Sequence, residues 1–361
     1  MEIFDFGSGI SDSTRNSKGE PRDGVAQMSR RLERIDRPIK VLTEDIYALS
    51  SISTMFYVAA PRLFPALVVL ALPLVSPSGY IERVVILTAV YGLLAVSWDF
   101  IALSTGLVSL GQALFFGVGA YLAGLLSLQL GLPPILTLVL ATVLGASICT
   151  LLLAPCLPLR GIYFAMTTLV YPLLIARIIE ATAIVGGTDG LVGVESFPDV
   201  WVERYLILIF LLGSTFGLRR LMTTDLGLVL RSISDNDQAV SASGINITSH
   251  KLIALWIGSA VGSFAGAYFT HLYMFVGLSA FSLDLSILPI ACAVVGGIGT
   301  LSGAVLGAFI LVPLAEMLRD LGTLRIVSYS ILLVALILFK PEGLLNYLKR
   351  KYEQVERWVE V

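Results

Sequence analysis

The sequence predicts an all-α protein that crosses a membrane about eight to ten times. Of its 361 residues, 56% are hydrophobic and only 14% are charged, whereas an average soluble domain carries roughly 25% charged residues. The apolar residues form continuous runs, unlike the alternating segments of about ten residues that build a membrane β-barrel. Cys149, Cys156 and Cys292 are scattered through apolar sequence. We therefore expect them to be small buried hydrophobes and not disulfide or metal ligands.

The two ends of the chain are polar and frame a membrane domain at 61–345. Residues 1–60 are rich in Ser, Asp and Arg in their first forty positions and lack the short apolar core of a signal peptide. This composition predicts a cytoplasmic, partly disordered extension. The alternative is a basic surface helix, MSRRLERI, that touches anionic lipid. Residues 346–361 are expected to form a cytoplasmic tail.

Seven candidate spans precede residue 285, judged against the roughly 20 apolar residues that cross a hydrocarbon core of about 30 Å. The first is short unless residues before Pro61 extend it, and Pro133 and Pro134 mark one of the turns. The expected spans are 63–75, 85–103, 113–130, 135–154, 162–185, 205–218 and 252–276.

The stretch 285–315 contains no charged residue. A single helix of that length would measure about 46 Å at about 1.5 Å per residue, which is too long for the membrane core. The sequence GGIGTLSG lies in its middle. We therefore expect two short helices that meet at Gly299, followed by a last span at 326–339, which brings the total to ten segments.

The distribution of basic residues sets the expected orientation. With the N-terminus inside, ten crossings place the C-terminus and the interval 219–251 inside as well. All but five of the 24 Lys and Arg residues then lie on the inner side, as the positive-inside rule requires. The five outer residues are Arg83, Arg177, Arg204, Arg319 and Arg325.

Motifs for covalent chemistry are missing from the sequence. There is no G-x-x-x-x-G-K-[ST] phosphate loop, and GGIGTLSG lacks the βαβ context of a dinucleotide site. The GGTDG run at 186–190 is typical of a turn at a membrane edge. No soluble enzyme domain fits, and no polar cluster suggests an enzyme within the membrane. We expect no cofactor and no metal site.

Small residues recur at four-residue spacing on several spans. Gly258, Gly262 and Gly266 share one face of the span at 252–276, and such faces let helix backbones approach closely. Either ordinary bundle packing or a surface for sliding or dimerisation explains them. Similar pairs are Ala120 with Gly124, and Gly303 with Gly307.

Two glycine-interrupted stretches lie in the two halves of the membrane region. They are GLVSLGQALFFGVGAY at 106–121 and VVGGIGTLSGAVLG at 294–307, the second containing Gly296, Gly297 and Gly299. Broken helices at membrane depth are tolerated where they are buried or line a cavity, and their ends can hold polar substrate groups. The pattern is typical of a transporter built from related halves.

Ionisable residues inside membrane spans are functional candidates. Asp99 is the most isolated; it either reaches the interface or faces a pathway. Arg177 and Glu180 are three residues apart, so they share a helix face and can pair. His271 is interpreted as a hydrogen-bonded structural residue. Because residues 100–159 contain no acid, a proton relay is disfavoured.

The stretch Gly227–Gly244, within the interval 219–251, is the longest polar interval between two apolar regions. Within it, we expect Asp235 to N-cap a short helix from about Asn236 to Ser243, with Gly244 as the residue after its end. Arg231 and Asp237 are then available for ion pairs with a partner protein. The alternative is a solvated loop.

Taken in order, four stretches resemble one known family. They are SLGQALFFGVGAY at 109–121, LRGIYFAMTTL at 159–169 with VGGTDGL at 185–191, LGLVLRSISDNDQAVSASGINITSHKLIAL at 226–255 and VVGGIGTLSGAVLGA at 294–308. The chain resembles the permease subunits of branched-chain amino acid ATP-binding-cassette importers, especially the second of the two paired permeases, over about residues 60–350. It departs from the pattern at 238–241, at Asp99 and in its N-terminal extension.

The resemblance implies one half of a heterodimeric channel, served by two ATPase subunits inside and a substrate-binding protein outside. It implies that the interval 219–251 is the loop that couples to the ATPases, through Arg231, Asp235, Asn236, Asp237, Gln238, Ala239 and Gly244. It also implies pathway residues at Ser109, Gln112, Tyr163 and Thr167. Leucine, isoleucine and valine are the implied substrates, with urea or short amides as an alternative. An ion-gradient secondary transporter is the competing mechanism.

Overall fold

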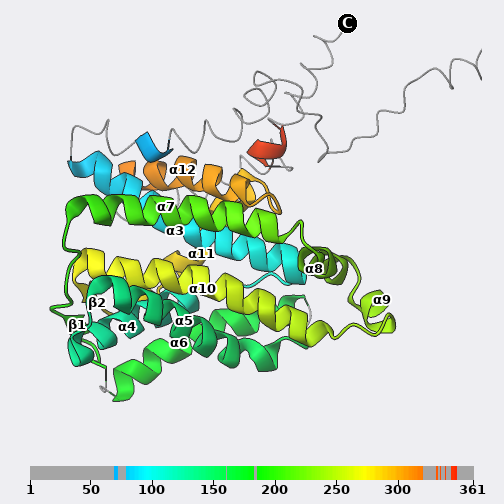
Figure 1. Ribbon diagram of the computed structural model, residues 1–361, viewed down its shortest axis with the longest axis horizontal. Helices are drawn as coiled ribbons and strands as arrows, with labels where there is room; N and C mark the ends of the chain where they lie inside the picture. The colour runs from blue at the N-terminus through cyan, green and yellow to red at the C-terminus, as the bar shows by residue number, and fades with distance from the viewer. Residues whose placement is uncertain are drawn as a thin grey trace, which may run out of the picture. The chain divides into compact units, whose positions relative to one another are not determined.

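The computed structural model places most of the described chain in long apolar helices (Figure 1). It describes residues 69–71, 79–159, 161–182, 185–319 and 343–347, together with positions 331, 334 and 338. Within these residues, six helices are long and apolar enough to cross a membrane, and two shorter apolar helices accompany them. The all-α multi-pass fold predicted from the sequence is therefore confirmed.

The six long helices correspond to the second to seventh expected spans. Some of their ends differ from the expected ones. For example, Asn246 accepts a hydrogen bond from the Ser249 N–H at 3.2 Å and caps the last of these helices, which begins before its expected first residue. They are α3 Gly79–Thr105, α4 Gln112–Leu130, α5 Pro134–Leu153 (followed by the 3-10 turn η1, Ala154–Cys156), α6 Ile162–Thr182, α7 Val200–Leu221 and α10 Ile247–Tyr273.

The uncharged stretch at 285–315 forms two short helices, as predicted from its length. These are α11, Asp284–Gly296, and α12, Ser302–Met317, joined by a turn at 297–301 that contains Gly299. The two helices pack against each other closely, because a Cβ atom on Gly296 would overlap the carbonyl oxygen of Gly303. The backbone of Gly299 has a φ of +80°, which glycine adopts without steric cost.

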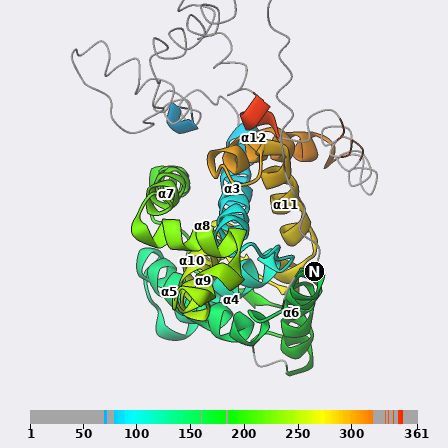
Figure 2. The same ribbon diagram turned by 90° about the vertical axis from the view of Figure 1, so that its right-hand side faces the viewer.

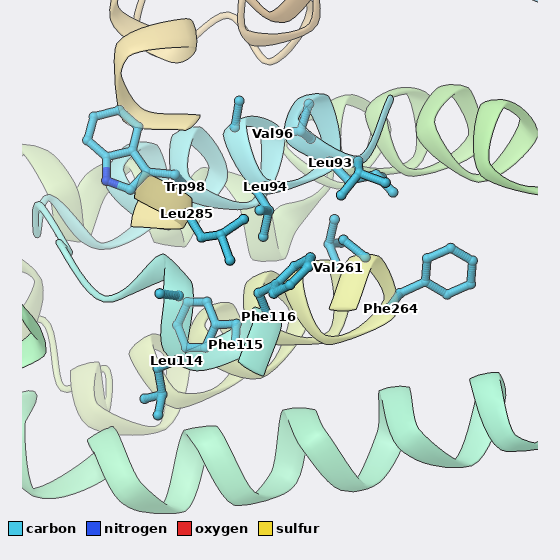
Figure 3. Packing of buried hydrophobic residues seen from close by; sticks show 14 of the residues in the cluster. Leu93, Leu94, Val96, Trp98, Leu114, Phe115, Phe116, Val261, Phe264 and Leu285 are labelled. Atoms are coloured by element: carbon cyan, nitrogen blue, oxygen red, sulfur yellow. The ribbon is translucent and has the colours of Figure 1, made fainter. Parts of the chain in front are cut away.

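The centre of the described bundle is α3, which packs against α10, α11, α12 and α7. Viewed along the bundle, α3 lies between α7 and α11 (Figure 2). Its residues Leu93 and Leu94 are fully buried, and Figure 3 shows how the apolar side chains of α3, α4, α10 and α11 meet. The core of the protein is therefore the contact region of these four helices.

The glycine face of α10 packs within the chain. A Cβ atom on Gly258 would collide with the Ile101 side chain, and one on Gly266 would overlap the carbonyl oxygen of Phe116. A Cβ atom on Gly262 would likewise lie only 2.7 Å from the Cβ of Phe115. Of the two interpretations offered by the sequence, bundle packing is the one observed, and this face is not available for dimerisation.

A small antiparallel ribbon closes the end of the bundle opposite α8 (Asp225–Asp235) and α9 (Asp237–Ala242) (Figure 1). Its strands are β1, Leu191–Val192, and β2, Phe275–Val276, and a 3-10 turn η2, Leu278–Phe281, follows the second strand. The ribbon was not predicted. The GGTDG run before β1 forms the expected turn, with Gly186 at φ +80° and Gly190 at φ +71°.

Several interpretations of single residues are settled by their contacts. The three cysteines are free and buried, as expected. Arg177 donates to the Glu180 carboxylate at 2.6 Å, so the predicted pair is present. His271 is fully buried and contacts the Thr137 hydroxyl at 2.6 Å and the Glu195 carbonyl oxygen at 2.7 Å, which confirms its structural role.

Some expectations fall on parts of the chain that are not described. The extension at 1–60 lies outside the described residues, and so do the tail from 348 onward and almost all of the expected spans at 63–75 and 326–339. They remain predictions from the sequence.

Candidate functional site

Three consecutive residues in the C-terminal third of α3 each contact another part of the fold. Asp99 is fully buried, and its carboxylate accepts hydrogen bonds from the Gly299 N–H at 2.6 Å and the Leu301 N–H at 2.7 Å. Asp99 is therefore enclosed by other parts of the chain and does not extend to an exposed surface. The reason is that the turn between α11 and α12 folds onto α3 at this level and covers the side chain.

The Asp99 carboxylate compensates for two costs in the turn at 297–301. Backbone N–H groups at the start of a helix have no partner within that helix, and Gly299 and Leu301 precede α12. Leu301 also has a φ of +53°, a strained value for a residue with a side chain. A buried carboxylate is itself costly unless it is hydrogen-bonded. The two groups therefore satisfy each other.

The neighbouring residues of α3 contact the non-helical segment at 106–111, between α3 and α4. The Trp98 indole N–H donates to the Ser109 carbonyl oxygen at 2.7 Å. The Ser97 hydroxyl donates to the Gly258 carbonyl oxygen of α10 at 2.7 Å and lies 3.3 Å from Oε1 of Gln112. We name Ser97, Trp98 and Asp99 with these partners the α3 junction. The turn at 297–301, the non-helical segment at 106–111 and α10 all meet at this junction.

The first glycine-rich stretch is broken at its start and not in its middle. Gly106 has a φ of +67°, and the chain runs without helical structure to Gly111 before α4 begins. Gly117 and Gly119 lie inside α4, where Cβ atoms would collide with Phe281 and with the Ser263 backbone. These glycines therefore permit close packing instead of breaking the helix.

The four expected pathway residues separate into two pairs. Ser109 and Gln112 are fully buried at the α3 junction, and Nε2 of Gln112 has no hydrogen-bond partner among the described residues. Tyr163 is 70% exposed on α6, and the Thr167 hydroxyl donates to its carbonyl oxygen at 2.8 Å. The described part of the chain does not bring the four together, and their role stays a prediction.

A cavity of 210 Å³ lies elsewhere, between α3, α4, α10, the β2–η2 connection and the start of α11. None of the four expected pathway residues lines it. Its polar lining includes Asp284, Ser279 and Ser282, and the sequence argument did not single out any of them. The available signal was that Asp284 is the one charged residue between His271 and Glu316.

The polar interval forms two helices and not one. α8 buries Gly227, Leu230 and Ile233, and α9 follows after a break at Asn236. The side-chain oxygen of Asn236 accepts from the Gln238 and Ala239 N–H groups, both at 3.1 Å. The expectation that Asp235 caps this helix is wrong by one residue, because Asp235 is the last residue of α8.

The rest of the interval shows which residues are accessible. Gly244 has a φ of +82° directly after the end of α9, as expected for its position. Asp237 is half-buried, with its carboxylate 4.0 Å from the Lys251 ammonium of α10. The remaining predicted coupling residues are exposed, namely Arg231, Asp235, Asn236, Gln238 and Ala239.

The unusual residues at 240 and 241 have a local explanation. Val240 is 8% exposed, whereas Ser241 is exposed. The valine therefore fixes one face of α9 to the protein, whereas the serine faces solvent. In turn, α8 packs against the end of α3, where a Cβ atom on Gly106 would lie 3.1 Å from the Ser234 carbonyl oxygen.

Six membrane-length helices, a hairpin of short helices and a polar helix pair at one end define a multi-pass membrane protein. Residues 80–340 match the family described as branched-chain amino acid transport system / permease component. The chain belongs to this family.

Curated relatives agree with the family. The chain is 28% identical to the high-affinity branched-chain amino acid transport system permease protein LivM of Salmonella typhimurium and to that of Escherichia coli, over 78% of this chain and 73% of each relative. It is 25% identical to a probable branched-chain amino acid transport permease protein LivH of Methanocaldococcus jannaschii, over 64% of this chain and 78% of the relative. No solved structure matches the chain.

Proposed function

We propose that this chain is a permease subunit of an ATP-binding-cassette importer that moves branched-chain amino acids across the cell membrane. The observation that carries the proposal is the family match over residues 80–340, which includes both α8–α9 and the turn at 297–301. Relatives named as branched-chain amino acid permeases support the substrate class. The chain itself carries out no covalent chemistry, and ATP hydrolysis belongs to separate ATPase subunits.

The proposed assembly has five parts besides the lipid bilayer. This chain pairs with a second permease subunit, and the similarity to both LivM and LivH proteins supports such a pair. Two cytoplasmic ATPase subunits and an extracytoplasmic substrate-binding protein complete the importer. The proposed location is the plasma or inner membrane, with both termini in the cytoplasm. The distribution of basic residues supports that orientation, because it would place all but five of the 24 Lys and Arg residues on the inner side.

α9 offers the ATPases a surface of suitable geometry. Gln238 and Ala239 are exposed on it, while Val240 and the contact between Asp237 and Lys251 fix its other side to the bundle. A force applied to α9 therefore acts on α10, and through α8 on the end of α3. Because α3 carries the α3 junction, a displacement of α3 would move the segments at 106–111 and 297–301. This is the proposed route from ATP binding to the pathway.

Uptake of radiolabelled L-leucine into proteoliposomes tests the proposal. The complete complex, containing this chain, the second permease, both ATPases and the binding protein, should accumulate leucine only when ATP is present on the ATPase side. Omitting the ATPases should abolish uptake. An ionophore that collapses ion gradients should leave uptake unchanged.

Each alternative gives a different result in the same assay. A secondary transporter predicts leucine uptake by this chain alone, driven by an imposed ion gradient and abolished by the ionophore. An amide permease predicts ATP-dependent uptake of labelled urea but not of leucine. Either outcome would contradict the proposed function.

A further inference from the structure

The cavity of 210 Å³ lies at the β-ribbon end of the bundle, away from α8 and α9 (Figure 1). Pockets for drug-sized ligands measure about 300–1,000 Å³, so this cavity suits a smaller molecule. Its walls come from α3, α4, α10 and α11, together with β2 and η2. A ligand bound there would touch every helix of the core.

One side of the cavity is apolar and aromatic. Phe116 of α4 and Phe269 of α10 are in edge contact, with ring centroids 5.2 Å apart. Phe275 and Leu285 extend the same wall, and Leu285 lies next to Phe116 where α11 meets α4 (Figure 3). An aliphatic side chain that packs against this wall is removed from water, which stabilises its binding.

The other side of the cavity is polar and carries one formal charge. Asp284, the first residue of α11, is exposed toward solvent, and its carboxylate has no hydrogen-bond or ion-pair partner among the described residues. Ser279 and Ser282 add hydroxyl groups, and the lining includes no Lys, Arg or His. The dipole of α11 favours an acid at this position. A cationic group in the cavity would pair directly with this carboxylate.

This combination selects among possible ligands. A lipid acyl chain would fit the aromatic wall but leave the carboxylate without a partner, and an anionic headgroup would be repelled by it. A small molecule with an ammonium group at one end and an aliphatic group at the other satisfies both sides. A branched-chain amino acid has this chemistry, with a carboxylate that can accept from the serine hydroxyls.

We propose that this cavity binds the amino acid during translocation. Asp284 accepts hydrogen bonds from the α-ammonium group, Ser279 and Ser282 donate to the carboxylate, and the aliphatic side chain packs on Phe116 and Phe269. The proposal rests on the proposed function, since it assigns a site to that substrate. It also places the substrate against α3 and α11, and the Asp99 contact ties α3 to the turn that follows α11.

The first test substitutes the carboxylate in the complete reconstituted complex. Asp284→Asn should lower the initial rate of ATP-driven L-leucine uptake at least about tenfold, as expected for the loss of a charge-assisted hydrogen bond. Asp284→Glu should retain more uptake than Asp284→Asn, because it keeps the negative charge that faces the ammonium group. Glu195→Gln is the matched control, because its exposed side chain lies at the same end of the bundle; it should transport as the wild type does.

A second variant tests the apolar side of the site through selectivity. Ala280 lines the cavity, so Ala280→Val should reduce its volume and shift the ratio of leucine to valine uptake in favour of valine. A purely structural defect would lower both rates equally. Wild-type uptake by Asp284→Asn, or an unchanged leucine to valine ratio in Ala280→Val, would overturn the site while the proposed function stands. A wild-type complex that does not take up leucine would contradict the proposed function itself.

Discussion

Replacing Asp99 should destabilise the junction between α3 and the turn at 297–301. In Asp99→Ala, the N–H groups of Gly299 and Leu301 lose their acceptors at 2.6 and 2.7 Å inside the protein. Each unsatisfied buried group costs about 1–3 kcal/mol. Removing the buried carboxylate also removes its own desolvation cost, so we expect a net loss of about 2–3 kcal/mol in the free energy of unfolding.

The size of the loss can be compared with two related variants. Asp99→Asn keeps one acceptor oxygen and should lose about 1–2 kcal/mol. Ser97→Ala removes the hydroxyl that donates to the Gly258 carbonyl oxygen at 2.7 Å and should lose about 1 kcal/mol. Titration of the purified protein in mild detergent with sodium dodecyl sulfate measures all three. If Asp99→Ala is no less stable than Ser97→Ala, the account of the junction is wrong.

Two further predictions compare matched positions. A Cβ atom at Gly266 would overlap the Phe116 carbonyl oxygen, whereas one at Gly213 of α7 meets no described atom within 4 Å. The same detergent titration should show Gly266→Ala destabilised by at least about 1–3 kcal/mol and Gly213→Ala stabilised by about 0.5–1 kcal/mol. Equal effects of the two substitutions would contradict the packing. Asn236→Ala should remove the cap of α9 and destabilise that helix by about 1 kcal/mol, while Asp235→Ala should have little effect. Hydrogen exchange of the α9 amides measures the difference. A larger effect of Asp235→Ala would show that the capping assignment is wrong.

Much of the fold could be predicted because it depends on local sequence. Apolar runs of membrane length are confirmed as α3 to α7 and α10, and the split of 285–315 follows from its length and the glycines around Gly299. Caps were harder to place, since Asp235 and Asn236 are both good N-cap residues. The extended backbone of Asn236, with φ −155° and ψ 95°, decides between them.

The contacts between distant parts of the chain could not be predicted from one sequence. Asp99 and Gly299 are 200 positions apart, so the burial of the carboxylate depends on how the hairpin of α11 and α12 folds onto α3. The cavity beside Asp284 is formed by four helices and the β2–η2 connection. Similarly, the glycines of α10 show that helices approach closely but not which helices they contact. Only the folded chain identifies Ile101, Phe115 and Phe116 as the residues they meet.

The central claim is that partner ATPases act on α9. Photo-cross-linking in the assembled complex tests it most directly, with a photoreactive residue at the exposed position Gln238 and, as a control, at the exposed position Glu195 near the opposite end of α10. We predict cross-links to an ATPase subunit from position 238, changing in yield when ATP is added, and none to an ATPase from position 195. Cross-links to the ATPase from position 195 but not from 238 would contradict the account.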